Sequence, residues 1–258
     1  MKYYVVADVH GFYTELKNVL EEKGFFNDET PHKLVICGDL FDRGEEAVRL
    51  QEFIVELLEK DEVILVRGNH EDLIVQMFSN FRWMMDPWAF DVHLQNGTID
   101  TALQLSGMDL LEMSENLKKT RVCMEGTPLF QKILPAMVNC FETEHYIFVH
   151  GWIPCDVEKY AGGAKLYKYR ASWREAAPIE WDKARWHNGI DAARQGVIEP
   201  NKTIVCGHWR CSYGHALEGK GEEWGDNADY SPYYAKGIIA LDACTAASGR
   251  VNCVVIED

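Results

Sequence analysis

Basic residues are scarce in this chain: 26 Lys and Arg stand against 41 Asp and Glu, giving a net charge of −15. Affinity for nucleic acid rests largely on Lys and Arg, so this balance argues against a nucleic-acid-binding protein. No run approaches the roughly 18 apolar residues of a membrane span, and the apolar run at residues 3–7 is too short for a signal peptide. We therefore expect a cytoplasmic protein with neither nucleic acid nor membrane as partner.

Cysteine pairs at zinc-site spacing are also lacking. The eight cysteines are scattered, and Cys206 and Cys211 resemble half of a zinc site without a second pair at suitable spacing. Cys37 and Cys206 end apolar, strand-like runs, where a reduced cysteine is usually a small buried hydrophobe. We therefore expect no structural zinc site. We expect reduced cysteines, with disulfides as a minor alternative.

The apolar content is sufficient for a substantial core, since 47% of the 258 residues are apolar, and we expect one domain spanning residues 1–258. Strand-like runs at residues 2–7, 33–37 and 63–66 each lead through a polar loop into a helical pattern. This alternation predicts βαβ units and a largely parallel sheet. Because ligands bind beyond the carboxyl ends of such strands, the three loops should line one crevice.

The remaining chain follows other patterns. Residues 81–140 contain Trp- and Met-rich helical segments broken by Gly and Pro, which we interpret as a helical insertion. The strand pattern returns at residues 144–149 and 203–206. Residues 209–236, rich in Gly and acids, are interpreted as a long loop near the site. Residues 237–241 and 250–256 are expected to form two closing strands joined by a turn.

Five apolar runs end in residues that commonly bind metals. Two divalent ions about 3.5 to 4 Å apart need a ligand that reaches both, and a carboxylate does this best. Asp39 is the candidate bridge. The remaining expected ligands are Asp8 and His10 on one ion, and Asn69, His150 and His208 on the other. Mixed imidazole and carboxylate ligands fit Mn, Fe or Zn.

These residues predict a phosphoesterase whose nucleophile is a metal-bridging hydroxide, formed because the ions lower the pKa of a water. Arg43 can hold phosphate oxygens with its planar guanidinium. His70, next to Asn69, can protonate the leaving group if Asp42 keeps it oriented and protonated.

The motifs together resemble the calcineurin-like metallophosphoesterases. They are Asp8-x-His10, Gly38-Asp39-x-x-Asp42-Arg43-Gly44, Gly68-Asn69-His70-Glu71, His150-Gly151 and Gly207-His208, in that order. Within that family they look like the phosphoprotein phosphatases, a group that includes small serine/threonine phosphatases and dinucleoside tetraphosphatases. The resemblance implies a four-layer α/β/β/α sandwich and two divalent ions, with manganese expected and iron or zinc as alternatives. It also implies phosphate contacts from Asn69 and His70.

The same resemblance implies a second phosphate-binding arginine between the two late histidines. Arg185, beside Trp186, is our choice, and Arg174, beside Trp173, is the reserve. We expect the substrate to be a serine/threonine phosphoprotein, with a bis(5'-nucleosyl) tetraphosphate or another small phosphate ester as the alternative. The oligomeric state does not follow from the sequence.

A cysteine-dependent phosphatase is a remote alternative, because Cys followed by five residues and Arg occurs at Cys37 and at Cys244. That mechanism requires backbone N–H groups and a helix N-terminus around the phosphate. Asp39 and Asp42 in the first loop would repel phosphate, and the second loop is expected to lead into a strand without a helix. A non-catalytic metal-binding protein is disfavoured since every expected ligand is present.

Overall fold

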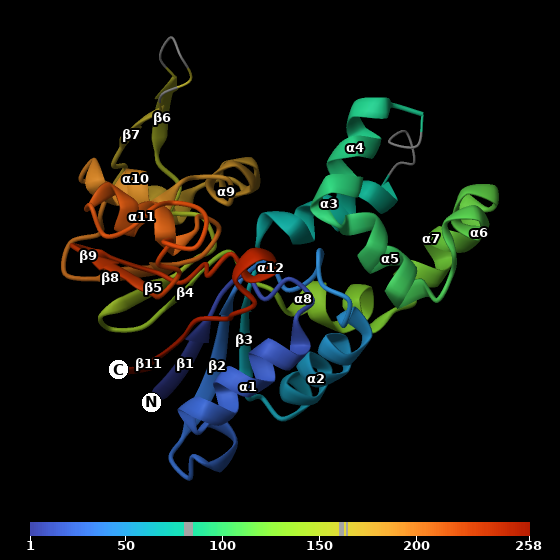
Figure 1. Cartoon of the computed structure of the whole chain (residues 1–258), viewed down its shortest axis with the longest axis horizontal. Helices are drawn as coiled ribbons and strands as arrows, with labels where there is room; N and C mark the ends of the chain where they lie inside the picture. Colours follow the sequence, from blue (N-terminus) through green and yellow to red (C-terminus); the bar gives the residue numbers. More distant parts are fainter. Residues whose placement is uncertain (80–84, 160–162, 164) are drawn as a thin grey trace.

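The structure is a computed structural model that describes residues 1–79, 85–159, 163 and 165–258. Within these residues two large β-sheets lie at the centre of the molecule (Figure 1). The first sheet has the order β11 (Cys253–Glu257), β1 (Lys2–Val6), β2 (His32–Cys37) and β3 (Val63–Val66). Strands β1, β2 and β3 are parallel, as predicted, and β11 is antiparallel to β1.

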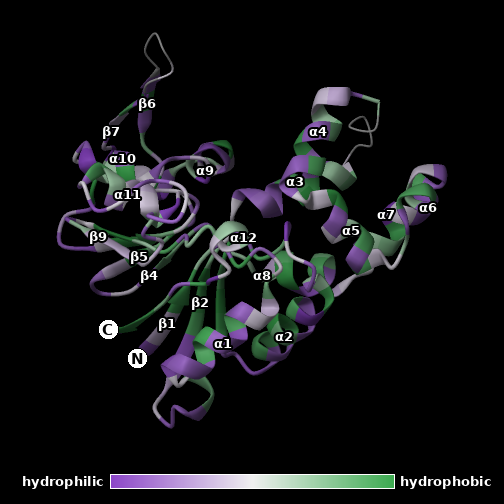
Figure 2. Cartoon of the chain, in the orientation of Figure 1, coloured by the Kyte–Doolittle hydropathy of each residue, from purple (hydrophilic) through white to green (hydrophobic). Residues whose placement is uncertain are grey.

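The parallel strands are apolar on both faces because both faces are covered. Val6 and Ile36 pack in a core shared with helices, whereas Val5 and Val35 pack against the second sheet. Figure 2 shows this as green, apolar colouring concentrated in the central strands. From Tyr3 to Val6 in β1 and from Leu34 to Cys37 in β2, the strands therefore carry no alternating polar face.

Helices α1 (Tyr13–Lys23), α2 (Ala47–Glu59) and α3 (Asn69–Ser79) follow β1, β2 and β3 in the chain. Leu16 and Leu20 of α1, and Leu50 and Ile54 of α2, stand four residues apart and are buried in the core under the first sheet. Residues at this spacing share one helix face, which explains why the apolar stripes in the sequence predict the helices.

The second sheet has the order β4 (Phe141–Glu142), β5 (Tyr146–Phe148), β8 (Thr203–Cys206), β10 (Ile238–Ala240) and β9 (Tyr233–Ala235). Its outer face is covered by α9 (Pro178–Ala184), α10 (Gly189–Arg194) and α11 (Cys211–Leu217). Phe148 and Val205 on its inner face meet the first sheet in one buried cluster. The predicted α/β/β/α layering is confirmed.

A series of helices separates β3 from β4: α4 (Pro87–Asn96), α5 (Thr98–Ser106), α6 (Leu110–Glu115), α7 (Leu117–Glu125), a π-helical turn (Leu129–Ile133) and α8 (Leu134–Ala136). Figure 1 shows α4 to α7 extending away from the sheets on the side of α3. The start of the expected insertion, residues 81–84, lies outside the described residues. Gly97 and Gly107 end α4 and α5 in left-handed conformations typical of helix C-termini.

The chain ends differently from the expectation. Residues 209–236 begin with helix α11 and end in β9, so they are not one continuous loop. The predicted turn joining two closing strands is wrong: β10 and β11 lie in different sheets, and helix α12 (Thr245–Ser248) stands between them. An apolar run indicates a strand but not its pairing partner, which depends on contacts far away in the sequence.

A separate hairpin of β6 (Asp156–Lys159) and β7 (Lys165–Lys168) and two short 3-10 turns (Phe25–Asn27 and Trp173–Glu175) complete the described structure. Among the helices of the described ranges, none combines the length and the apolar character needed to cross a bilayer.

Candidate active site

Polar residues at the strand ends share an unusual backbone conformation. Their φ angles lie between 51° and 76°, the left-handed region, at Asp8, His10, Asp39, Asp42, Arg43 and His208. Each such residue costs of the order of 1–3 kcal/mol, and such costs persist chiefly at functional sites. The turns lock neighbouring loops together, since Asp8 N donates to Gly38 O (3.2 Å) and His10 N to Asp39 O (3.0 Å).

Gly38 is required by close packing at this point. It has a φ of 83°, and a Cβ there would lie 2.5 Å from His150 Nδ1 and 2.7 Å from Gly68 Cα. The glycine therefore lets the loops after β2, β3 and β5 approach closely enough to bring their polar side chains together.

Two clusters of possible ligand atoms occur where these loops meet. His10, Asp39 and His70 form the first ligand group, and Asp39, His150 and His208 form the second; within each, the atoms lie within 4.8 Å of one another. Asp39 belongs to both, as the expected bridge should. His70 stands in the first group in the place where Asp8 was expected.

Asp8 and Asn69 lie beside the second ligand group. Both carboxylate oxygens of Asp8 accept from His208 N at 3.0 Å, and Asn69 Oδ1 lies 2.8 Å from His150 Nε2. The structure thus brings all six predicted metal ligands to one region, with Asp8 engaged by the backbone of the His208 loop.

Backbone carbonyls orient two of the histidines. His10 Nδ1 donates to Phe41 O (3.0 Å) and His150 Nδ1 donates to Cys37 O (2.8 Å). A carbonyl only accepts, so in both rings Nδ1 carries a proton and Nε2 faces the ligand groups. This is the arrangement by which metal-ligating histidines are usually held.

The site brings buried carboxylates and imidazoles close together. Burial, followed by the charge of Asp242, raises the pKa of Asp8 well above its usual value. Burial by itself would lower the pKa of His150, but the charges of Asp39 and Asp8 outweigh it and raise the pKa to about 10. Buried carboxylates and imidazoles crowded in this way are stabilised by a cation. The donor set present therefore fits divalent metal ions.

Asp242 is a residue of this site that the sequence analysis missed. It is buried, burial raises its pKa, and its Oδ1 accepts from Cys244 N (2.7 Å). It directly follows β10 and Leu241, the same position after an apolar run that marked the other acids. That position was the available signal.

Asp42 and His70 form a buried pair. His70 Nδ1 donates to Asp42 Oδ2 at 2.6 Å. Thr98 and Thr101 of α5, also missed from the sequence, donate their hydroxyls to Asp42 Oδ2 (3.0 Å) and Oδ1 (2.8 Å). Burial alone would lower the pKa of His70, but the charges of Asp39 and Asp42 raise it above its usual value. The ring is thereby held in one orientation, with Nε2 on the side of the first ligand group, 3.8 Å from Asp39 Oδ2.

Arg43 covers the same histidines from the exposed side. Its Nη1 donates to His10 Nε2 (2.7 Å) and its Nη2 to His70 Nε2 (3.2 Å). The guanidinium therefore lies at the edge of the site, over the first ligand group.

The two later arginines differ in their surroundings. Arg185 is only 5% exposed; its Nε donates to Asp72 (2.6 Å) and its Nη1 to Asn139 (2.9 Å). Its backbone lies against Gly151, directly after His150. The reserve, Arg174, is instead bound to Glu142 and Glu199 and is not brought together with the other site residues.

The cysteines have no comparable surroundings. Cys37 is buried between the two sheets, and burial raises the pKa of its thiol, the opposite of what a cysteine nucleophile needs. Cys244, contrary to expectation, directly precedes helix α12, but burial and the charge of Asp242 raise its pKa too. Cys206 and Cys211 are free and buried, within apolar packing.

The fold and the site define a metal-dependent phosphoester hydrolase, and a family comparison agrees. The sequence model described as "Calcineurin-like phosphoesterase" matches residues 1–230. The chain belongs to this family, whose members use divalent metals.

Similar proteins have been named as tetraphosphatases. The asymmetrical bis(5'-nucleosyl)-tetraphosphatase PrpE of Bacillus subtilis (strain 168) is 34% identical over 237 residues, 85% of this chain and 90% of that protein. PrpE of Bacillus velezensis is 28% identical over 136 residues, 50% of this chain and 51% of that protein. A symmetrical tetraphosphatase of Buchnera aphidicola is 34% identical over 82 residues, 32% of this chain and 28% of that protein. The chain thus matches about half, or less, of the last two.

Solved structures share the fold at low sequence identity. A cold-active protein tyrosine phosphatase matches with a TM-score of 0.57 and 17% identity, covering 99% of this chain and 73% of that one. The cold-active protein-tyrosine phosphatase of a Shewanella species matches with a TM-score of 0.53 and 16% identity, covering 100% of this chain and 75% of that one. These likenesses concern the fold alone.

Proposed function

We propose that this chain hydrolyses bis(5'-nucleosyl) tetraphosphates with the help of two divalent cations. The observation that carries the proposal is that Asp39 belongs to both ligand groups, as a pair of bridged ions requires. The substrate class is supported by the B. subtilis relative, which aligns with most of this chain and bears that name. This support favours the tetraphosphate over the phosphoprotein that the sequence analysis expected first.

The proposed cations are manganese, with iron or zinc as alternatives, because imidazole, carboxylate and amide donors suit all three. The proposed ligands are Asp8, His10, Asp39, Asn69, His150 and His208. When bound, such ions would lower the pKa of a bound water to near neutrality. They would also neutralise charge on phosphate oxygens.

Arg43 is proposed to hold the reacting phosphate. His10 Nε2 has one lone pair, so it cannot both accept from Arg43 and bind a cation. Release of that bond frees a guanidinium at the exposed edge of the site, where it can hold two phosphate oxygens at once. Asn69 and His70, at the start of α3, are proposed to contact the same phosphate group.

His70 is proposed to protonate the leaving oxygen. Asp42 accepts from Nδ1, which fixes the ring and stabilises its charged form, and the same movement of Arg43 frees Nε2 to hold a proton. The proton then leaves from Nε2, while Thr98 and Thr101 keep Asp42 in place. A ring held on one side and open on the other is what a general acid needs.

Arg185 is proposed as a second phosphate contact, reached by exchange of partners. Its partner Asp72 also accepts from Arg67 Nε (2.8 Å), so Asp72 stays paired when Arg185 leaves it. The other carboxylate that accepts from Arg185, that of Asp182, is 51% exposed, so the exchange leaves no buried carboxylate without a partner.

The proposed function can be tested by comparing three substrates on the manganese-loaded protein: diadenosine tetraphosphate, a phosphoserine peptide and p-nitrophenyl phosphate. We expect the highest kcat/KM for diadenosine tetraphosphate, no turnover after EDTA treatment, and recovery on adding Mn²⁺. A higher kcat/KM for the phosphopeptide would replace the substrate. Turnover that survives complete removal of metal would contradict the role of the ligand groups.

A further inference from the structure

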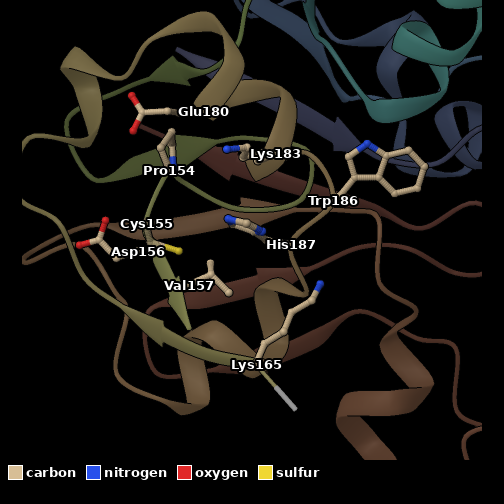
Figure 3. Close-up of a pocket in the computed structure, with 9 residues that line it drawn as sticks. All are labelled: Pro154, Cys155, Asp156, Val157, Lys165, Glu180, Lys183, Trp186 and His187. Carbon is tan, nitrogen blue, oxygen red and sulfur yellow. The ribbon is translucent and has the colours of Figure 1, made fainter. Parts of the chain in front are cut away.

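A cavity of about 670 Å³ lies beside the candidate active site, between hairpin β6–β7 and helix α9 (Figure 3). We call it the lysine pocket; the residues that matter are Pro154, Val157, Lys165, Lys183, Trp186 and His187. Its volume falls within the range of about 300–1,000 Å³ that small-molecule sites occupy. Neither the metal ligands nor the phosphate contacts proposed above line it.

Trp186 joins the pocket to the active site. Its indole lies edge-on to the ring of His208, a member of the second ligand group, with 5.8 Å between ring centroids. The side chain is 45% exposed, which is unusual for so large a ring. Figure 3 shows the indole at the edge of the pocket nearest the blue and teal ribbons, which belong to the first half of the chain. Trp186 therefore both lines the pocket and contacts a member of the second ligand group.

The pocket also carries positive charge in a strongly acidic protein. Lys165 and Lys183 form no ion pair with any residue that the structure describes, and both are exposed. Of the two acids on the lining, Glu180 already accepts from Arg170 and from Ala177 N. The carboxylate of Asp156 points away from the lysines in Figure 3. The lysines are thus available to an anion.

The other lining groups suit a flat heterocycle. Pro154 and Val157 give apolar walls, and Trp186 offers an exposed aromatic face for stacking. Burial, together with the charge of Lys165, lowers the pKa of His187 to about 4. A neutral imidazole offers one donor and one acceptor, which complements the edge of a nucleobase.

We propose that the lysine pocket binds the second nucleoside of a dinucleoside polyphosphate, with Lys165 and Lys183 meeting phosphates that are not being cleaved. This inference rests on the proposed function and names the part of the substrate that distinguishes it from a simple phosphate monoester. The first phosphate stays under Arg43, and the chain of phosphates extends past Trp186 into the pocket.

The test uses the manganese-loaded full chain and the double substitution Lys165→Gln with Lys183→Gln. The ratio of kcat/KM for diadenosine tetraphosphate to that for p-nitrophenyl phosphate should fall about tenfold or more, because two charge-assisted contacts are lost from the larger substrate. The matched control is Lys118→Gln with Lys119→Gln, two exposed residues of α7 that do not line the pocket. It removes the same amount of positive charge and should leave the ratio of the two kcat/KM values unchanged. An unchanged ratio in the pocket variant would overturn the proposal.

A binding measurement separates this proposal from the proposed function. A methylene-bridged, non-hydrolysable analogue of diadenosine tetraphosphate is titrated calorimetrically into wild type, the double variant and Val157→Trp, which fills the cavity. Weaker binding in both variants supports the pocket even if wild type turns over no dinucleotide, which would defeat only the proposed function. Equal binding in all three overturns the pocket. In the kinetic test, the double variant could lose kcat/KM only for a phosphoserine peptide. That result would assign the pocket to a peptide and overturn the proposal that it binds a nucleoside.

Discussion

Asp39 is the residue on which both ligand groups depend. We predict that Asp39→Asn lowers bound manganese and reduces kcat/KM by roughly 100- to 1,000-fold, since the metals supply several kcal/mol of charge stabilisation. Metal content can be measured by mass spectrometry beside the kinetics. The control Asp226→Asn changes an exposed acid and should alter neither quantity. Full metal content in Asp39→Asn would refute the bridging role.

The position of His70 fits two roles, that of a general acid and that of a metal ligand. It is hydrogen-bonded to Asp42, and it also belongs to the first ligand group. We predict that His70→Asn lowers kcat by about 10²- to 10⁴-fold with KM and metal content retained, as loss of a general acid does. His145→Asn, on an exposed histidine, should leave kcat unchanged. Loss of metal from His70→Asn would make this histidine a ligand instead.

At the scale of elements, helix α5 is tied to the loop after β2. Thr98 and Thr101 hold both oxygens of Asp42, and Asp42 N donates back to Thr101 Oγ1 (2.9 Å). The helices between β3 and β4 therefore help to position the proposed acid. The position of Asp42 depends on a helix that begins more than 50 residues later in the chain.

We predict that the double substitution Thr98→Val with Thr101→Val lowers kcat about tenfold, because His70 loses its fixed partner. It should also lower the free energy of unfolding by about 1–3 kcal/mol, since a buried carboxylate loses hydrogen bonds. Kinetics and urea unfolding measure the two effects. Thr127→Val, which removes a buried hydroxyl bonded to Met124 O, should reduce stability alone. If kcat in the double variant equals that of wild type, α5 has no positioning role.

At the scale of the whole molecule, the ligand groups join the two sheets. Asp8 and Asp39 follow strands of the first sheet, and His150 and His208 follow strands of the second. A cation bound among them connects both halves and offsets buried negative charge. Metal binding should therefore stabilise the entire fold.

We predict that Mn²⁺ at about 100 times its Kd raises Tm by about 5 to 10 °C over the EDTA-treated protein, the shift expected from ligand binding to the native state only. Thermal unfolding of wild type and of Asp39→Asn measures it, and the variant should show a much smaller shift. An equal shift in both would locate the stabilising ion elsewhere.

Much of the candidate site could be predicted because it is locally encoded. Asp8, Asp39 and Asn69 each follow an apolar run, and consecutive parallel strands bring their carboxyl ends to one edge. Asp242 has the same sequence context but was missed, because the carboxylate carried no neighbouring histidine or glycine motif. Thr98 could not be found, because threonine in a helix carries no sign of a partner in a distant loop.

By itself, then, the sequence determined the strand–loop–helix units, the series of ligands and the family motif, because each depends on neighbours within a few residues. Only the tertiary structure decided that β11 returns to the first sheet, that Arg185 is buried against Asp72, and that Trp186 contacts His208 while it lines a cavity that also carries two lysines. These features depend on which distant surfaces pack together, and a pattern of local periodicity does not contain that choice.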